Sequence, residues 1–226
     1  MALRLLIFDR DGVLVDVTDS YRQAICETVK LFTGAEITKQ EIQVLKNRGQ
    51  SNNDWDLTLE IVRSRGKNPT KKTVIAEFQK IYLGDHNDGL ISKERWLVRN
   101  GLLERLSQRF RLALFTGRER WEAAHTLGKF APGVVFEPIV GMEDVKREKP
   151  APEGLLKIVG QLTPDEVFYI GDVMDDCRAA LEARVSFIGV VPEDNPLGIE
   201  LASLFRRMGS LAVISSVNEL ESVLPS

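Results

Sequence analysis

The strongest constraint on the fold is an alternation of short apolar runs with helix-like segments after residue 99. Strands separated by helices cannot form hairpins, so this order favours a parallel sheet covered by helices on both faces. An apolar strand is also expected at 3–8. The expected later strands are 112–115, 135–140, 167–170, 187–191 and 211–214. The expected helices between and around them are 99–108, 119–129, 152–160, 175–183, 198–208 and a short last one from 217.

A different pattern runs from about 18 to 84, where apolar residues recur at helical spacing with no strand between them. The first helix should stop at Gly34. Thr38 and Glu41 form a capping-box pattern at the start of the second helix. Thr70 can cap a later helix. This stretch is therefore predicted to be entirely helical.

Together the two patterns predict an α/β fold with a doubly wound, parallel-sheet, Rossmann-like core and an inserted all-helical cap domain. The core should comprise residues 1–16 and 90–226, and the cap residues 17–89. The return linker is expected within 84–98, which is rich in Gly, Asp and Asn.

Composition excludes several classes of function. The 226 residues carry a net charge of −3 without a long basic run, so no nucleic-acid partner is expected. No apolar stretch is long enough to span a membrane, and the N-terminal one is too short for a signal peptide, which favours a cytoplasmic protein. Cys26, Cys177, His86 and His125 form no zinc-ligand pattern.

Chemically active residues stand where the expected strands end, which is where open α/β sheets bind ligands. They are Asp9, Asp11, Thr116, Gly117, Arg118, Asp172, Asp175 and Asp176, with Lys149 just before a proline-led helix start. Carboxylates, a hydroxyl, backbone donors and a lysine together suit a magnesium ion and a phosphoryl group.

Each of these motifs alone has an ordinary structural interpretation. The DRDG stretch, 9–12, could be a strand-end turn, since Asp and Gly favour turns. As a calcium loop it would have its glycine too early, with Ser20 where a Glu is needed. Asp175 and Asp176 could simply stabilise a helix N-terminus. The order of the motifs at successive strand ends is the informative signal.

Four motifs in order resemble those of the haloacid dehalogenase-like hydrolases: DRDGVLVD at 9–16, LFTGR at 114–118, KPAP at 149–152 and GDVMDD at 171–176. The resemblance covers nearly the whole chain. The helical stretch also matches the cap that this superfamily inserts after its first motif.

The resemblance implies a covalent mechanism. Asp9 would attack phosphorus and form an aspartyl-phosphate, with Mg²⁺ bridging Asp9 and the substrate. Asp172 and the backbone carbonyl of Asp11 would complete the protein ligands of the metal. The Asp11 side chain would protonate the leaving oxygen and later deprotonate water.

The resemblance also implies supporting roles. Thr116, the Gly117 N–H and Lys149 would hold the phosphoryl oxygens. Asp176 would orient Lys149 or a metal-bound water. Asp175 matches no fixed catalytic position and is expected only to begin a helix.

Several reactions remain open on this pattern. Asp11 favours phosphate-ester hydrolysis over dehalogenation, because a halide leaves without a proton. A sugar phosphomutase of the same superfamily is the main alternative to a phosphatase. A phospho-receiver switch is disfavoured because such domains are shorter and accept phosphate at a middle strand. An inactive interaction module is disfavoured because the acidic residues and Lys149 are all present.

The expected partner is a small phosphorylated metabolite, selected by the cap; oligomeric state cannot be inferred from these residues. Residues 46–57, KNRGQSNNDWDL, join two cap helices and are the expected specificity element. Within them the candidate substrate contacts are Arg48, Asn52, Asn53 and Trp55, and Arg118 in the core is a further one. Alternatively, Trp55 packs inside the cap and Arg48 is solvated.

Overall fold

The computed structural model describes residues 3–48 and 53–225. The chain divides into two compact units. The core unit comprises residues 1–15 and 96–226, and the helical unit comprises residues 16–95.

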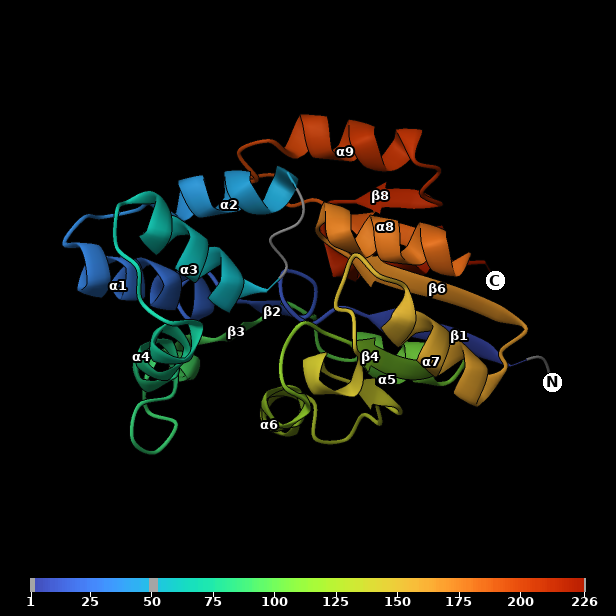
Figure 1. Cartoon of the computed structure of the whole chain (residues 1–226). Coiled ribbons are helices and arrows are strands. Elements are labelled where there is room, and N and C mark those ends of the chain that lie inside the picture. Colours follow the sequence, from blue (N-terminus) through green and yellow to red (C-terminus); the bar gives the residue numbers. More distant parts are fainter. Residues whose placement is uncertain (1–2, 49–52, 226) are drawn as a thin grey trace. The chain divides into compact units, whose positions relative to one another are not determined.

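The core unit is built on a parallel sheet of six strands (Figure 1). In sheet order these are β5 (Ile139–Val140), β4 (Arg111–Phe115), β1 (Arg4–Phe8), β6 (Glu166–Gly171), β7 (Ser186–Val190) and β8 (Ala212–Ile214). The first strand of the chain thus lies in the middle of the sheet, between β4 and β6. The predicted parallel α/β core is confirmed.

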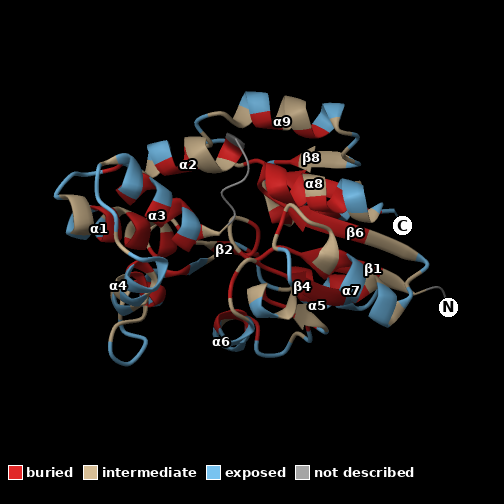
Figure 2. Ribbon diagram, in the orientation of Figure 1, coloured by how far each residue is buried: buried red, intermediate tan, exposed pale blue. Residues whose placement is uncertain are grey.

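Helices cover the sheet. They are α5 (Leu102–Ser107), α6 (Arg120–Phe130), α7 (Glu153–Leu162), α8 (Met174–Ala183), α9 (Gly198–Arg207) and α10 (Leu220–Val223), with the 3₁₀ turns η2 (Met142–Asp144) and η3 (Val217–Glu219). One apolar core joins the sheet residues Ile7, Phe115 and Tyr169 to Leu155 on α7 and Phe205 on α9. Figure 2 shows the strands mainly as buried, as expected for a sheet packed on both faces.

Strand register brings the carboxyl ends of three strands level. Phe8 pairs with Leu114 of β4 and with Ile170 of β6. The Asp9 N–H then donates to the Ile170 carbonyl at 2.8 Å. The residues that follow β1, β4 and β6 therefore emerge at the same edge of the sheet.

The helical unit contains α1 (Tyr21–Thr33), α2 (Lys39–Arg48), α3 (Asp54–Ser64), α4 (Lys71–Leu83) and the 3₁₀ turn η1 (Leu90–Lys93). The capping box is present: the Glu41 N–H donates to Thr38 Oγ1 at 3.2 Å, and the Thr38 N–H donates to Glu41 Oε2 at 2.8 Å. Thr70 caps α4 by accepting from the Thr73 N–H at 3.2 Å. The predicted four helices are confirmed.

Three features differ from the sequence-based expectations. The strand expected at 135–140 is only β5, 139–140; before it, the Glu137 N–H and the Pro138 carbonyl bond to β4 without forming a regular strand. Two short strands, β2 (Val15–Asp16) and β3 (Arg95–Trp96), pair at the unit boundary and are too short to leave a periodic pattern. The helical unit spans 16–95 rather than 17–89, since η1 packs on α1 and α4.

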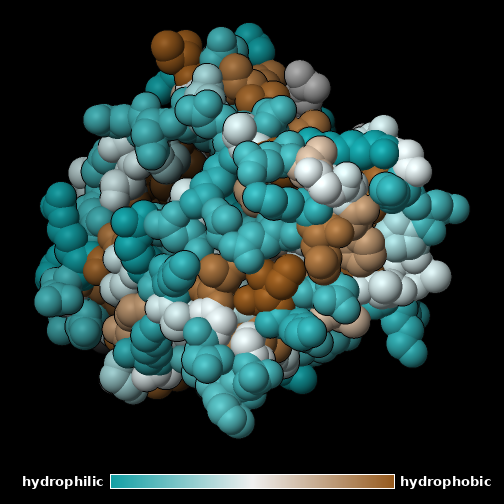
Figure 3. All heavy atoms as spheres, turned by 90° about the vertical axis from the view of Figure 1, so that its left-hand side faces the viewer, coloured by the Kyte–Doolittle hydropathy of each residue, from teal (hydrophilic) through white to brown (hydrophobic). Residues whose placement is uncertain are grey.

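None of the helices in the described ranges has both the length and the apolar character that a membrane span requires. Figure 3 shows a face on which hydrophilic side chains cover most of the surface and apolar ones form small patches.

Candidate functional site

Three buried carboxylates lie close together at the edge of the sheet where β1, β4 and β6 end. Oxygens of Asp9, Asp172 and Asp176 all lie within 4.8 Å of one another. Asp9 directly follows β1 and Asp172 directly follows β6, so the parallel register places them together. Asp176 joins them from the first turn of α8.

Lys149 links two of these carboxylates. Its Nζ lies 2.8 Å from Asp9 Oδ1 and 2.8 Å from Asp176 Oδ1. The lysine side chain is only 1% exposed, so these ion pairs are shielded from water. Three carboxylates and one ammonium leave the cluster with a formal net charge of −2.

Burial dominates the electrostatics of Asp9. It raises the pKa of this carboxyl to about 7, with Lys149 opposing the shift and Asp176 and Asp11 adding to it. Burial alone would lower the pKa of Lys149, but the charges of Asp176 and Asp9 outweigh it and hold that pKa above its ordinary value. The lysine therefore stays charged between its two partners.

Asp176 is held from several sides. Its Oδ2 accepts the backbone N–H groups of Asp172 at 3.1 Å and Val173 at 3.2 Å. Its Oδ1 accepts the Tyr169 hydroxyl at 2.7 Å. These bonds fix the Asp176 carboxylate where it contacts Lys149.

The second aspartate of the first motif has different partners from Asp9. Arg10 Nη1 donates to Asp11 Oδ1 at 2.5 Å, and Arg118 Nε donates to Asp11 Oδ2 at 2.6 Å. The Arg118 Nη2 lies 2.5 Å from the same Oδ2. Two carboxylates separated by one residue are thus stabilised by different cations: Lys149 for Asp9, and two arginines for Asp11.

The other predicted phosphate-binding residues lie at the end of β4. Thr116 is buried and its Oγ1 accepts the Arg118 N–H at 3.2 Å. Gly117 is half-buried in the turn that follows the strand. Both positions are at the same sheet edge as Asp9, and their phosphate-binding role stays a prediction.

The candidate substrate contacts of the helical unit are only partly described. Arg48 ends α2, but its side chain, like the whole of Asn52, lies outside the described residues. Asn53 caps α3, its Oδ1 accepting the N–H groups of Trp55 at 3.1 Å and Asp56 at 3.2 Å. Trp55 is buried within the helical unit. These two side chains therefore have structural roles, and substrate contact stays a prediction for all four.

Two contributors to the site were not predicted from the sequence. Tyr169 has the pattern of an ordinary core residue of its strand, yet its hydroxyl holds Asp176. Arg10 lies between two aspartates directly after a buried strand, and this position in the sequence could have indicated that it pairs with one of them. Asp175 is buried in the first turn of α8, 3.5 Å from Arg178 Nη1, in keeping with the expected helix start.

The donor set fits a hard divalent cation. Carboxylate oxygens are the ligands that Mg²⁺ prefers. Burial makes the negative charge of these carboxylates costly, and such an ion would offset it. Gly12 adds a steric requirement, since a Cβ built there would overlap the Asp172 carboxylate.

We expect Gly12→Ala to weaken Mg²⁺ binding at least tenfold. The methyl group would displace the Asp172 carboxylate, and the backbone φ of +75° adds strain for any L-residue. Isothermal titration calorimetry would measure the Mg²⁺ affinity. Urea denaturation should show that the free energy of unfolding falls by about 1–2 kcal/mol.

Gly209→Ala is the matched control, because Gly209 has a φ of +84° and a Cβ at this position would meet nothing within 4 Å. It should show the strain cost and unchanged Mg²⁺ affinity. Equal Mg²⁺ affinity in both variants would contradict the role of Gly12.

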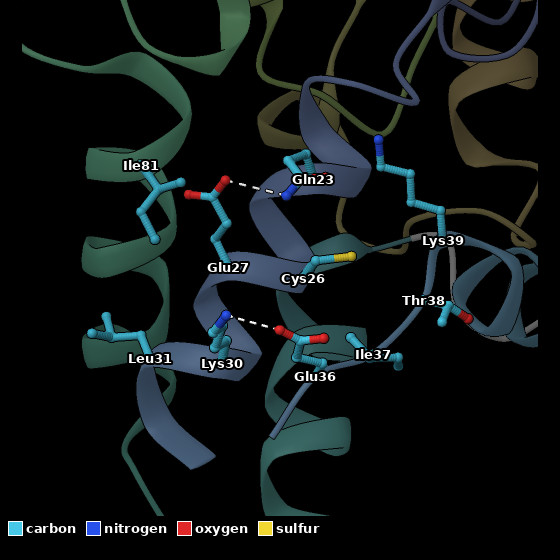
Figure 4. Close-up of a pocket in the computed structure, with 10 residues that line it drawn as sticks. All are labelled: Gln23, Cys26, Glu27, Lys30, Leu31, Glu36, Ile37, Thr38, Lys39 and Ile81. Atoms are coloured by element: carbon cyan, nitrogen blue, oxygen red, sulfur yellow. Dashed lines mark hydrogen bonds and ion pairs between the residues drawn. The ribbon is translucent and has the colours of Figure 1, made fainter. Parts of the chain in front are cut away.

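A cavity of about 730 Å³ lies in the helical unit (Figure 4). Leu31, Ile37 and Ile81 contribute apolar surface to its lining. Most of its charged groups have partners within the lining: Lys30 Nζ lies 2.9 Å from Glu36 Oε1, and Gln23 donates to Glu27 at 3.2 Å. Lys39 instead pairs with Asp19, outside the lining. All of its lining residues belong to the helical unit, whereas those of the carboxylate cluster belong to the core unit.

Comparison with known proteins places this site in a family. The haloacid dehalogenase-like hydrolase family matches residues 6–190. An imidazoleglycerol-phosphate dehydratase of Phytophthora nicotianae is 31% identical over 99% of this chain, which spans about half (53%) of that protein. Phosphoglycolate phosphatase 1 of Pseudomonas aeruginosa is 28% identical, with 80% of this chain and 67% of that protein covered.

Solved structures agree on the fold. A candidate haloacid dehalogenase-like hydrolase from Bacteroides fragilis superposes with a TM-score of 0.76 at 23% identity, covering 96% of this chain and 99% of the other. At this identity the likeness supports the fold alone. The family match spans the carboxylate cluster, Lys149 and the whole helical unit. The chain is therefore an enzyme that belongs to the haloacid dehalogenase-like hydrolase family.

Proposed function

We propose that this protein is a Mg²⁺-dependent phosphatase that hydrolyses a small phosphate monoester through an aspartyl-phosphate on Asp9. The observation that carries the proposal is the buried cluster of Asp9, Asp172 and Asp176 with Lys149 between two of them. A nucleophilic carboxylate, further acidic metal ligands and one fixed cation are what phosphoryl transfer to a side chain requires.

The names of the relatives support a phosphatase. Several of the similar proteins are phosphoglycolate phosphatases, among them those of Pseudomonas aeruginosa and Pseudomonas putida. The dehydratase of Phytophthora nicotianae is about twice as long as this chain, so its name does not identify the reaction of this chain.

In the proposed first step, an Asp9 oxygen attacks phosphorus and the leaving oxygen takes the electron pair of its bond to phosphorus together with a proton from Asp11. Lys149 and the Thr116–Gly117 turn would hold the phosphoryl oxygens as charge shifts. In the second step, water attacks phosphorus, Asp11 takes its proton, and Asp9 is released with inorganic phosphate.

Asp9, Asp172 and the backbone carbonyl of Asp11 would hold Mg²⁺, with Asp176 close by. The ion supplies positive charge that offsets repulsion between the carboxylate nucleophile and the phosphate dianion.

A panel of small phosphate esters tests this proposal. Phosphoglycolate, phosphosugars and histidinol phosphate would each be incubated with the full chain and Mg²⁺, with inorganic phosphate as the readout. We expect at least one ester to be hydrolysed, and EDTA to stop the release. Activity that persists in excess EDTA would exclude the metal role, and failure on every ester would count against the phosphatase.

The same reactions followed by ³¹P NMR distinguish the phosphomutase alternative. A mutase would convert a phosphosugar into its positional isomer with little inorganic phosphate. A phosphatase would show inorganic phosphate as the main product.

A further inference from the structure

We propose that Arg10 and Arg118 are positioning residues that hold the Asp11 carboxylate as the base for hydrolysis of the aspartyl-phosphate. This inference rests on the proposed function and deepens it. It names two residues for which neither the sequence motifs nor the comparisons supply a role in that step.

The geometry fixes both oxygens of one carboxylate. Arg10 donates to Oδ1 at 2.5 Å, and Arg118 reaches Oδ2 through Nε at 2.6 Å and Nη2 at 2.5 Å. With each oxygen bound by a different arginine, the Asp11 side chain cannot rotate about its terminal bonds without losing a charge-assisted hydrogen bond.

Both arginines are themselves buried and anchored. The side chains of Arg10 and Arg118 are 2% and 3% exposed, whereas that of Asp11 is 20% exposed. Arg10 Nη2 donates to Thr126 Oγ1 on α6 at 2.5 Å. The Arg118 N–H donates to Thr116 Oγ1, which ties it to the end of β4. Asp11 is thus the most exposed side chain of the three, and it is held by a frame of two buried arginines.

Such a frame suits proton acceptance. The Asp11 side chain is 20% exposed while the arginines hold both of its oxygens, so water can approach the positioned carboxylate. In the hydrolytic step a water oxygen bonds to phosphorus, and the bond from phosphorus to Asp9 breaks with its electron pair returning to Asp9. The water proton passes to Asp11. Holding the acceptor in place removes the entropic cost of orienting it.

Burst kinetics with p-nitrophenyl phosphate test this role. Nitrophenolate leaves without a proton, so the first step does not need Asp11 and only the second step should slow. We expect Arg118→Met and Arg10→Met to lower kcat about 10–100-fold while kcat/KM stays within threefold. A rapid burst of about one nitrophenolate per enzyme should precede slow turnover, and Arg118→Lys should recover part of kcat.

Two comparisons make the test specific. When Asp11 is already replaced by Asn, adding Arg118→Met should lower kcat by less than about a further threefold, because the arginine acts through the aspartate. Arg120→Ala is the matched control, because Arg120 lies two residues after Arg118 in the chain but its side chain is 55% exposed. This variant should have the kinetics of the wild type. If a buried arginine variant does not fold, Thr126→Val loosens Arg10 more gently and should still produce a burst.

Three results would overturn the proposal. A fall in kcat at constant KM without a burst indicates a merely structural role. A rise in KM that persists in the Asp11→Asn background indicates contact with the substrate. Unchanged kcat in both methionine variants shows that the arginines are dispensable. Failure of the phosphatase proposal is separate, because the wild-type chain would then not turn over p-nitrophenyl phosphate.

Discussion

Asp9→Asn is expected to lower turnover of any accepted ester by at least about 10³-fold, because an amide oxygen is a poor nucleophile. The change removes one charge and almost no volume, so the fold should be retained. Phosphate release under saturating Mg²⁺ would measure the loss, and mass spectrometry of acid-quenched samples should show phosphorylation of the wild-type chain only. Near-native turnover of the variant would exclude Asp9 as the nucleophile.

The electrostatic description of the site also predicts whether Asp9→Asn raises or lowers the stability of the chain, and how this change depends on pH. Burial raises the pKa of Asp9 to about 7 in the folded chain, against an ordinary value of 3.8. A raised carboxyl pKa favours folding most below pH 4, and this contribution is lost as pH rises through 7. Asp9→Asn lacks the buried charge, so with EDTA it should unfold at a higher temperature than the wild type at pH 8, with a smaller difference at pH 5.

Asp16→Asn should change the stability of the chain in the opposite direction to Asp9→Asn. Burial would raise the pKa of Asp16, but hydrogen bonds from Thr18 and the Arg95 guanidinium outweigh it and lower that pKa. Removing this charge should therefore destabilise the chain at neutral pH, and the deficit should shrink only in acid. A destabilised Asp9→Asn at pH 8 would contradict the electrostatic description of the site.

The second large effect is expected for Lys149→Met. The lysine lies 2.8 Å from both Asp9 and Asp176, and its removal leaves buried carboxylates without their cation. We expect the free energy of unfolding at pH 8 without metal to fall by about 3–5 kcal/mol. Turnover should fall about 10²–10³-fold, because the charge that would hold the phosphoryl oxygens is lost. Urea denaturation and phosphate release measure the two effects.

The loss of stability in Lys149→Met should be smaller at acidic pH. Lys149 lowers the pKa of Asp9, so in its absence that pKa should lie above about 7. Asp9 should then take up a proton as pH falls from 8, and the repulsion left by the missing lysine should decrease. Lys157→Met is the matched control, since Lys157 is 48% exposed and 3.6 Å from Asp144 Oδ1 on the same unit. It should change stability by less than about 1 kcal/mol. Equal effects at both lysines would show that Lys149 has no special role.

Much of the architecture could be predicted because periodicity and strand ends are local features. Helices α1 to α4 follow from spacing, and the ends marked by Gly34, Thr38 with Glu41, and Thr70 follow from those residues; the Asn53 cap of α3 was not predicted. The grouping of Asp9 with Asp172 followed from a general property of parallel sheets, in which successive strands end at one edge. The shortened β5 and the two-residue strands β2 and β3 depend on single hydrogen bonds that no periodicity records.

The partners of each charge could not be predicted in the same way. Arg10 contacts its neighbour Asp11 and also Thr126, which is 116 residues away in the chain. Tyr169 holds Asp176 although its strand position marks it as a core residue. Such contacts depend on how α6, α8 and the loop after β5 pack on the sheet.

The sequence by itself therefore determined the parallel core, the helical insertion and the list of residues at the strand ends, because each depends on nearest neighbours along one element. Only the tertiary structure decided how the two aspartates of DRDG share the available cations. Asp9 is paired with Lys149, and Asp11 with Arg10 and Arg118. The reason is physical: buried charges select their partners by distance in the folded chain, and packing between elements sets those distances.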